Sequence, residues 1–205
     1  MMIASVTENE INAAKLRTQR EGQYKNSFHK QKAMVYGFVG EIVFDRLMKG
    51  ILGQNNSKIV DKYDYDIQLK LKQTTLNLEI KTSKYKQRQT DRLLISANNP
   101  TQRAHLYVFL SVQLNSDQTS GFLYFRGAVK TSTFRRSASY IEDDILFPAF
   151  SISTQQCHNF PVFLDKLFKI QQSNRRKEQT KKQSMFIKTD STPAQLALKI
   201  FQIND

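Results

Sequence analysis

The sequence predicts an α/β protein in which a central mixed β-sheet is flanked by helices and followed by a helical C-terminal extension. Residues 8–20 and 35–50 have the composition and the apolar spacing of three and four that helices show. Residues 65–81 instead alternate apolar and polar side chains, which is the period of a half-buried strand. Between 105 and 112 the apolar residues are nearly continuous, as in a strand buried on both faces. A chain of 205 residues is long enough to enclose one sizeable core built from these elements.

Both predicted helices have boundary signals. Thr7 and Glu10 have the spacing of a capping box, so the first helix is expected to begin directly after Thr7. The second helix is expected to end near Gly50, because glycine commonly terminates helices. It carries Glu41 and Asp45, which are four residues apart and therefore lie on one side of the helix, beside its apolar stripe. The simplest alternative is that both acids are solvated.

The alternating stretch predicts a β-hairpin. The alternation starts at Tyr65, stops at a polar turn around Gln73, and resumes as far as Lys81. Side chains two apart in a strand point to the same side. Asp66 in the first strand, and Glu79 with Lys81 in the second, are therefore expected on one polar face.

Further elements follow the hairpin. Residues 83–92 are polar and basic, and a loop is expected at 98–100. A short helix over 131–140 is expected to expose Arg135 and Arg136. The remaining expected elements are strands over 105–112, 122–129 and 150–153, and a helix around 163–168.

Composition divides the chain into a domain and an extension. Residues 1–170 are expected to form one domain, with its core over 35–129. Residues 171–190 are rich in basic side chains and poor in large apolar ones, which indicates a solvated linker or an arm that orders on a polyanion. A C-terminal helix is expected within 191–205, where a Thr-Pro pair provides a helix start.

Charge and cysteine content narrow the function classes. The formal net charge of +13 favours polyanionic partners, of which nucleic acid is the commonest and an anionic membrane surface the next. No uncharged stretch is long enough to span a bilayer, so a soluble, cytoplasmic protein is expected. Cys157 is the only cysteine, and the three histidines lack ligand spacing, which argues against a zinc site. Oxygen ligands remain as the plausible metal chemistry.

The stretch LEIKTSK, residues 78–84, contains a charged pair inside an apolar strand. Desolvating Glu79 and Lys81 is costly unless these groups have partners or hold a metal. The triplet Glu79-Ile80-Lys81 is the only acid-x-Lys sequence in the chain, although such a triplet alone arises easily by chance. An ion pair on the exposed face of a hairpin is the plain structural interpretation, and such a pair contributes little stability.

Three segments together resemble the PD-(D/E)xK nuclease superfamily, which has the restriction-endonuclease-like fold. They are Gly37-Phe38-Val39-Gly40-Glu41, Tyr65-Asp66-Ile67 and Leu78-Glu79-Ile80-Lys81-Thr82, and residues 104–112 are similar to the family's next core strand. The resemblance covers about 35–129. Two departures are visible: Tyr65 stands where the proline of the motif's name would be, and Asp64 competes with Asp66 for the ligand role.

The resemblance implies a Mg²⁺-dependent DNA endonuclease in which Mn²⁺ substitutes for Mg²⁺. Asp66 and Glu79 would then be metal ligands, since carboxylate oxygens suit hard cations. Glu41 would complete a second metal position or hold a metal-bound water. Lys81 would orient or help deprotonate the attacking water and neutralise charge on the phosphate. The implied catalytic residues are therefore Glu41, Asp66, Glu79 and Lys81.

Within this class a site-specific enzyme of the restriction or homing type is expected, because sizeable segments lie outside the core. The alternatives are a Holliday-junction resolvase or repair nuclease, and a non-catalytic DNA-binding protein with the same fold. Cutting both strands usually needs two active sites, so a homodimer or higher homo-oligomer is expected from the resemblance. Side chains expected to contact DNA phosphates are Lys84, Tyr85, Lys86, Arg88, Arg92, Arg135, Arg136, Arg175 and Arg176.

Overall fold

A computed structural model describes residues 1–21, 31–62, 65–72, 74–86, 91–96, 103–141 and 149–172. The chain divides into two compact units, Met1–Asp165 and Lys166–Asp205. Only 166–172 of the second unit belong to the described residues, so the fold below is that of the first unit.

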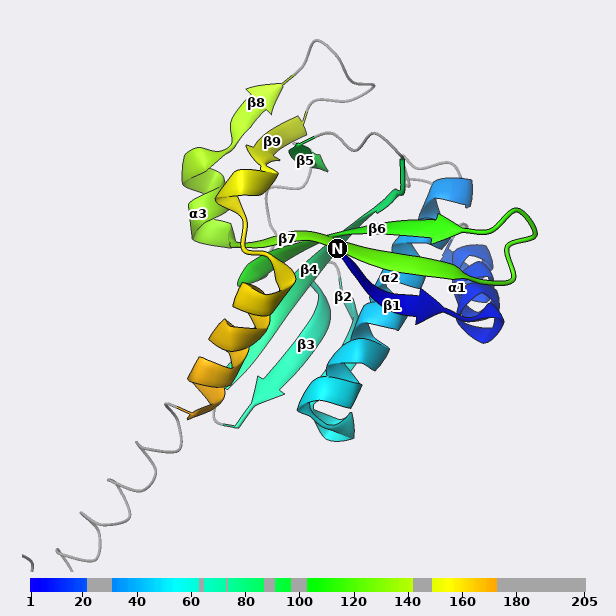
Figure 1. The fold of residues 1–205 in the computed structure, drawn as a ribbon, viewed down its shortest axis with the longest axis horizontal. Helices are drawn as coiled ribbons and strands as arrows, with labels where there is room; N and C mark the ends of the chain where they lie inside the picture. Colours follow the sequence, from blue (N-terminus) through cyan, green and yellow to red (C-terminus); the bar gives the residue numbers. More distant parts are fainter. Residues whose placement is uncertain are drawn as a thin grey trace, which may run out of the picture. The chain divides into compact units, whose positions relative to one another are not determined.

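The first unit contains a curled, six-stranded mixed sheet (Figure 1). Strands β4 and β6 are parallel, while every other neighbouring pair in this sheet is antiparallel. The hairpin of β3 and β4 therefore joins the sheet at its centre through β6. In spatial order the strands are β1 (Met2–Val6), β7 (Gly121–Lys130), β6 (Leu106–Leu114), β4 (Thr74–Lys84), β3 (Tyr65–Leu71) and β2 (Ser57–Lys62).

A second, three-stranded antiparallel sheet lies at one end of the large sheet, close to helix α3 (Thr131–Ser137) (Figure 1). Its strands, in spatial order, are β5 (Arg92–Ser96), β9 (Ala149–Ser153) and β8 (Ser139–Ile141). Apolar side chains of β5 and β9 form one buried cluster with side chains of β6, β7 and α3. That cluster consists of Leu93, Ile95, Tyr107, Phe109, Val129, Phe134 and Ile152.

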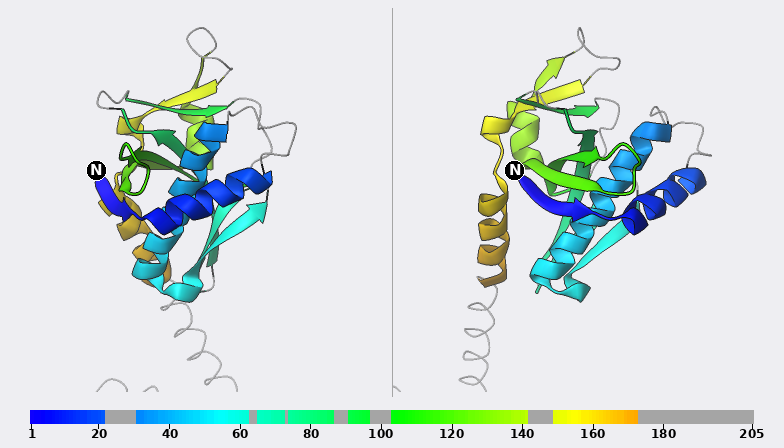
Figure 2. Two further views of the ribbon diagram at one scale, coloured as in Figure 1. Left: turned by 90° about the vertical axis from the view of Figure 1, so that its right-hand side faces the viewer. Right: turned by 45° about the vertical axis from the view of Figure 1, so that its right-hand side comes forward.

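Helix α2 (Gln31–Leu52) packs against the face of the large sheet opposite the buried cluster, and α1 (Glu8–Glu21) lies across α2 (Figure 2). Val39, Val43 and Phe44 of α2 are fully buried, as their spacing of three and four requires for one apolar stripe. A further helix covers residues 160–172. None of the described helices is both long and apolar enough to cross a bilayer.

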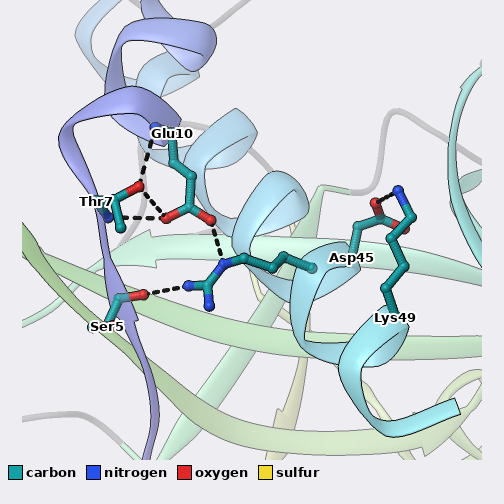
Figure 3. Close-up of polar contacts among 6 residues, drawn as sticks. Ser5, Thr7, Glu10, Asp45 and Lys49 are labelled. Carbon is teal, nitrogen blue, oxygen red and sulfur yellow. Dashed lines mark hydrogen bonds and ion pairs between the residues drawn. The ribbon is translucent and has the colours of Figure 1, made fainter. Parts of the chain in front are cut away.

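The start of α1 is fixed by the predicted capping box. Glu10 accepts hydrogen bonds from the backbone N–H and the hydroxyl of Thr7, both at 2.9 Å (Figure 3). The same carboxylate forms an ion pair with Arg46 of α2, whose guanidinium also donates to the carbonyl of Ser5, each at 2.6 Å (Figure 3). One acid therefore caps α1 and ties it to both α2 and β1.

The predicted helices over 8–20 and 35–50 are confirmed, as is the hairpin with its turn near residue 73. The strands expected over 105–112, 122–129 and 150–153 and the helix around 163–168 are confirmed too. The helix expected over 131–140 is confirmed as far as Ser137 and wrong for its last three residues: Ala138 is extended, and Ser139–Ile141 form β8. The polar, basic segment 83–92 overlaps both strands that flank it, since β4 continues to Lys84 and β5 begins at Arg92.

Candidate active site

Glu79 and Lys81 lie side by side on the central strand β4. The Lys81 Nζ atom is 2.6 Å from the Glu79 Oε1 atom, and the Glu79 side chain is only 7% exposed whereas that of Lys81 is 30% exposed. In the parallel register Glu79 stands beside Tyr107 and Lys81 beside Phe109, so the ion pair shares a face of the sheet with the buried aromatic cluster. The Lys81–Glu79 ion pair expected from a plain structural interpretation is present, but the Glu79 carboxylate is buried instead of exposed.

Asp66 stands at the start of β3, next to the ion pair. Its Oδ2 atom accepts the backbone N–H of Ile80, the residue between Glu79 and Lys81, at 2.7 Å. Burial raises the pKa of the Asp66 carboxyl, while the Ile80 hydrogen bond and the charges of Lys81 and Arg17 act to lower it. The aspartate is therefore held on the backbone of the triplet that the sequence singled out.

Glu41 reaches the same neighbourhood from helix α2. Burial, followed by the negative charge of Asp66, raises the pKa of Glu41 to about 8, although Arg17 opposes this shift. Arg17 of α1 donates to the Glu41 Oε2 atom at 2.6 Å and to Glu21 at 2.8 Å. Its guanidinium also lies over the ring of Phe38, 4.2 Å from the centroid.

Arg17 was not among the predicted site residues. The sequence marks it only as one of several basic residues on the first helix, because its contact with Glu41 depends on how α1 packs across α2. Burial tends to lower the pKa of Arg17, but Glu41 and Glu21 outweigh this and raise it. The guanidinium is therefore charged, and it neutralises part of the acidic site.

Gly40 explains how α2 comes close enough to position Glu41. A Cβ atom on Gly40 would lie 2.1 Å from the Thr82 Oγ1 atom of β4, so only glycine allows this approach. The Thr82 hydroxyl is buried and has no hydrogen-bond partner in the described part of the chain. The helix and the strand that carry Glu41, Glu79 and Lys81 are thus in direct contact.

The acids nevertheless approach β4 from different sides. Alternation along β4 places Thr82 toward α2 and Glu79 with Lys81 on the opposite face. Asp66 connects the two sides, since it interacts electrostatically with Glu41 on one and with Lys81 on the other. The structure therefore joins the four predicted catalytic residues as two ion pairs, Arg17–Glu41 and Lys81–Glu79, with Asp66 between them.

Divalent metal chemistry fits the donor set of this site. Burial raises the pKa of Glu41 most and the negative charge of Asp66 raises it further, so a hard cation near these two acids would favour their ionised forms. Within the described ranges, however, no group of three or more His, Cys, Asp or Glu side chains is close enough together to hold a metal ion. Asp66 and Glu79 supply carboxylate oxygens, the ligand type that hard cations prefer, but here they bind the Ile80 N–H and Lys81.

Two other acids from the sequence analysis have different outcomes. Asp45 is buried on α2 and accepts the Ser57 hydroxyl at 2.6 Å. It also pairs with Lys49 at 2.7 Å (Figure 3). It is neither a solvated residue nor part of the candidate site. Asp64 lies outside the described residues, so the choice between Asp64 and Asp66 stays a prediction.

Most of the basic side chains expected to contact DNA are exposed. Those in the described ranges with exposed side chains are Lys84, Lys86, Arg92, Arg135 and Arg136. Tyr85 is half-buried and stacks on Tyr124 of β7, with the ring centroids 4.4 Å apart. Arg88, Arg175 and Arg176 lie outside the described residues.

Tyr107 is a further side chain that the sequence did not single out. It lies beside Glu79 in the register of β4 and β6, and burial together with the charge of Glu79 raises the pKa of its phenol. A neutral hydroxyl and a buried carboxylate therefore share this part of the sheet. The sequence around Tyr107 is apolar and gives no sign of a charged neighbour. Glu79 becomes its neighbour only through the pairing of β4 with β6.

Comparison of the chain with protein-family models, with curated proteins and with solved structures found no match. The argument for a function therefore depends on the residues and geometry described above.

Proposed function

We propose that this protein is a Mg²⁺-dependent DNA endonuclease with a restriction-endonuclease-like core. The observation that carries the proposal is the arrangement around Ile80: Asp66 accepts its N–H, and the buried Glu79 on one side is ion-paired to Lys81 on the other. The strand order supports it, since a β-hairpin bearing the acids is followed by a strand parallel to its second arm. The net charge of +13 suits a DNA substrate.

In this proposal Asp66 and Glu79 hold Mg²⁺, which supplies Lewis-acid stabilisation of the scissile phosphate when bound; Mn²⁺ substitutes for it. Lys81 leaves its ion pair with Glu79 and donates to the attacking water or to a phosphate oxygen. Glu41 orients water at the side of the site that faces α2. Arg17 holds the Glu41 carboxylate in place, so it is a positioning residue.

The proposed enzyme acts in the cytoplasm on specific DNA sites, in the manner of a restriction or homing endonuclease, and as a homodimer or higher homo-oligomer. A Holliday-junction resolvase or repair nuclease is the alternative within the same chemistry. One observation favours a non-catalytic DNA-binding protein instead: the described acids do not form a three-carboxylate metal group.

Plasmid cleavage separates these functions. Wild-type protein is incubated with supercoiled DNA and Mg²⁺, with and without EDTA, beside Lys81→Ala, Asp66→Asn and the control Lys70→Ala, which removes an exposed lysine at the far end of β3. We expect cleavage by wild type and by the Lys70 variant only, and only without EDTA. Salt-sensitive binding without cleavage of duplex, single-stranded or branched DNA would favour the binding protein.

A further inference from the structure

A polar strip continues from the candidate site along the same face of the sheet. Ser83 is the next residue of β4 on the side of Lys81, and the register pairs it with Ser111 of β6. The two hydroxyl oxygens are 3.1 Å apart. Ser111 is fully buried, so this strip has a hydroxyl fixed at its base rather than a loose surface group.

A β-bulge adds a guanidinium to the strip. Phe109 pairs with Gly127 and Leu110 with Phe125, so Arg126 is an extra residue on β7. Its Nη1 atom lies 3.5 Å from the Ser111 hydroxyl. Bulges re-aim side chains, and here the extra residue directs a half-buried arginine over the serine pair.

Aromatic side chains bound the far end of the strip. Tyr85 follows Ser83 on β4 at the same two-residue spacing, and it stacks on Tyr124, the register partner of Ser111. The Tyr124 hydroxyl donates to Gln113 at 2.9 Å. These contacts fix the strip between the Lys81–Glu79 pair and a rigid pair of rings.

We propose that Arg126 and Ser83, held by the buried Ser111 hydroxyl, form a phosphate subsite that holds the DNA backbone beside the scissile phosphate. A guanidinium has a fork of N–H donors that matches phosphate oxygens, and neighbouring hydroxyls add donors. The proposal rests on the proposed nuclease function for the identity of its ligand. Ser83 lies two residues beyond Lys81, about 6.7 Å along β4 or roughly two nucleotide rises of a DNA strand, and Arg126 lies two strands away on β7, so the subsite would hold a phosphate next to the scissile one.

The charge of Arg126 supports this placement. Burial lowers the pKa of the guanidinium, while the charges of Asp91 and Tyr85 act to raise it. The guanidinium therefore lies near the charge of Asp91, at the start of the segment that leads into β5, and it is a cation that can attract a phosphate.

The test is DNA affinity in EDTA, where no cleavage occurs. Binding of a short fluorescent duplex is measured by anisotropy over a range of salt concentrations for wild type, Arg126→Gln and Arg126→Lys. We expect Arg126→Gln to weaken binding about tenfold and to reduce the salt slope by about 1, because one phosphate contact is lost. Arg126→Lys keeps the slope but loses part of the affinity, since the fork is absent.

Lys58→Gln is the matched control. It removes the same charge from an exposed residue of β2, at the opposite edge of the sheet from β7 and β1, and should leave affinity and slope nearly unchanged. The inference is overturned if Arg126→Gln changes only thermal stability, if the Lys58 variant has the same effect, or if wild type does not bind DNA. If Arg126→Gln weakens binding but wild type never cleaves DNA with Mg²⁺, the subsite stands and the nuclease proposal fails.

Discussion

The two faces of β4 differ in what they pack against and in what they carry. Toward α2 the strand presents Leu78 and Ile80, both buried, and Thr82 against Gly40. Toward the β5–β9–β8 sheet it presents Glu79, Lys81 and then Ser83. The α2 face is closed by apolar contacts, whereas the other face keeps charged groups under partial cover. A single strand thus anchors the fold on one side and carries the charged residues of the candidate site on the other.

The largest effect is expected on the charged face. Lys81→Ala should reduce the rate of DNA cleavage by about 10²–10³, the usual loss when one preorganised donor to a transition state is removed. DNA affinity in EDTA should change little, because a basic surface supplies most of the binding. Cleavage kinetics and anisotropy on the same duplex measure both. Equal losses in rate and affinity would mean that Lys81 only binds DNA.

The buried Glu41 predicts a dependence of stability on pH. Its pKa is raised from 4.5 to about 8 by burial and by Asp66, so the folded state keeps this proton to higher pH than the unfolded chain does. The contribution of Glu41 to the free energy of unfolding, measured in EDTA, should therefore be largest below about pH 4.5. It should fall as the pH rises toward 8.

Denaturant titrations of wild type and Glu41→Gln at several pH values measure this effect. Between pH 4.5 and about 8, the difference in the free energy of unfolding between wild type and Glu41→Gln should change by at most about 5 kcal/mol, since each pKa unit corresponds to about 1.4 kcal/mol. Mg²⁺ should reduce the decline in wild type, because a cation favours the ionised acids. Parallel pH profiles for the two proteins would show that Glu41 titrates normally.

Gly40 tests the contact on the α2 face. Gly40→Ala places a methyl group against Thr82 and should destabilise the fold by about 1–3 kcal/mol, the usual cost of overpacking. Gly37→Ala is the control on the same helix: no atom lies within 4 Å of its added Cβ, so it should stabilise the helix by about 0.5–1 kcal/mol. Chemical denaturation gives both values, and similar effects at the two glycines would contradict the close approach.

The smallest effect is expected at the Thr82 hydroxyl. Its Oγ1 atom is buried without a hydrogen-bond partner in the described ranges, so Thr82→Val should raise the free energy of unfolding by about 1 kcal/mol. Thr82→Ser, which keeps the hydroxyl, serves as the comparison. A loss of stability in the valine variant would indicate that this hydroxyl has a partner in solution.

Local patterns predicted the elements but not their partners. The capping box at Thr7, the apolar stripe of α2 and the alternation around Glu79 are each visible within a few residues, and each is present in the structure. Strands β1, β2 and β5 were not predicted, because their short segments lack a clear period of two and are defined by pairing with distant strands.

The candidate site likewise contains residues that the sequence could place together and residues that only tertiary packing brings there. Glu79 and Lys81 share one face because strand geometry dictates it, so the sequence could place them together. Arg17 and Arg126 could not be found from the sequence, because the first depends on how two helices cross and the second on a bulge that re-aims one residue. That Glu41 comes from the opposite side of β4 is likewise a property of helix packing.

Metal binding at Asp66 and Glu79 is the central claim, and anomalous diffraction from crystals grown with Mn²⁺ and a short DNA duplex tests it most directly. The proposal predicts an anomalous peak within about 2.0–2.6 Å of carboxylate oxygens of both residues, with Lys81 released from Glu79. Mn²⁺ bound elsewhere, with the Lys81–Glu79 ion pair intact beside the DNA, would contradict it.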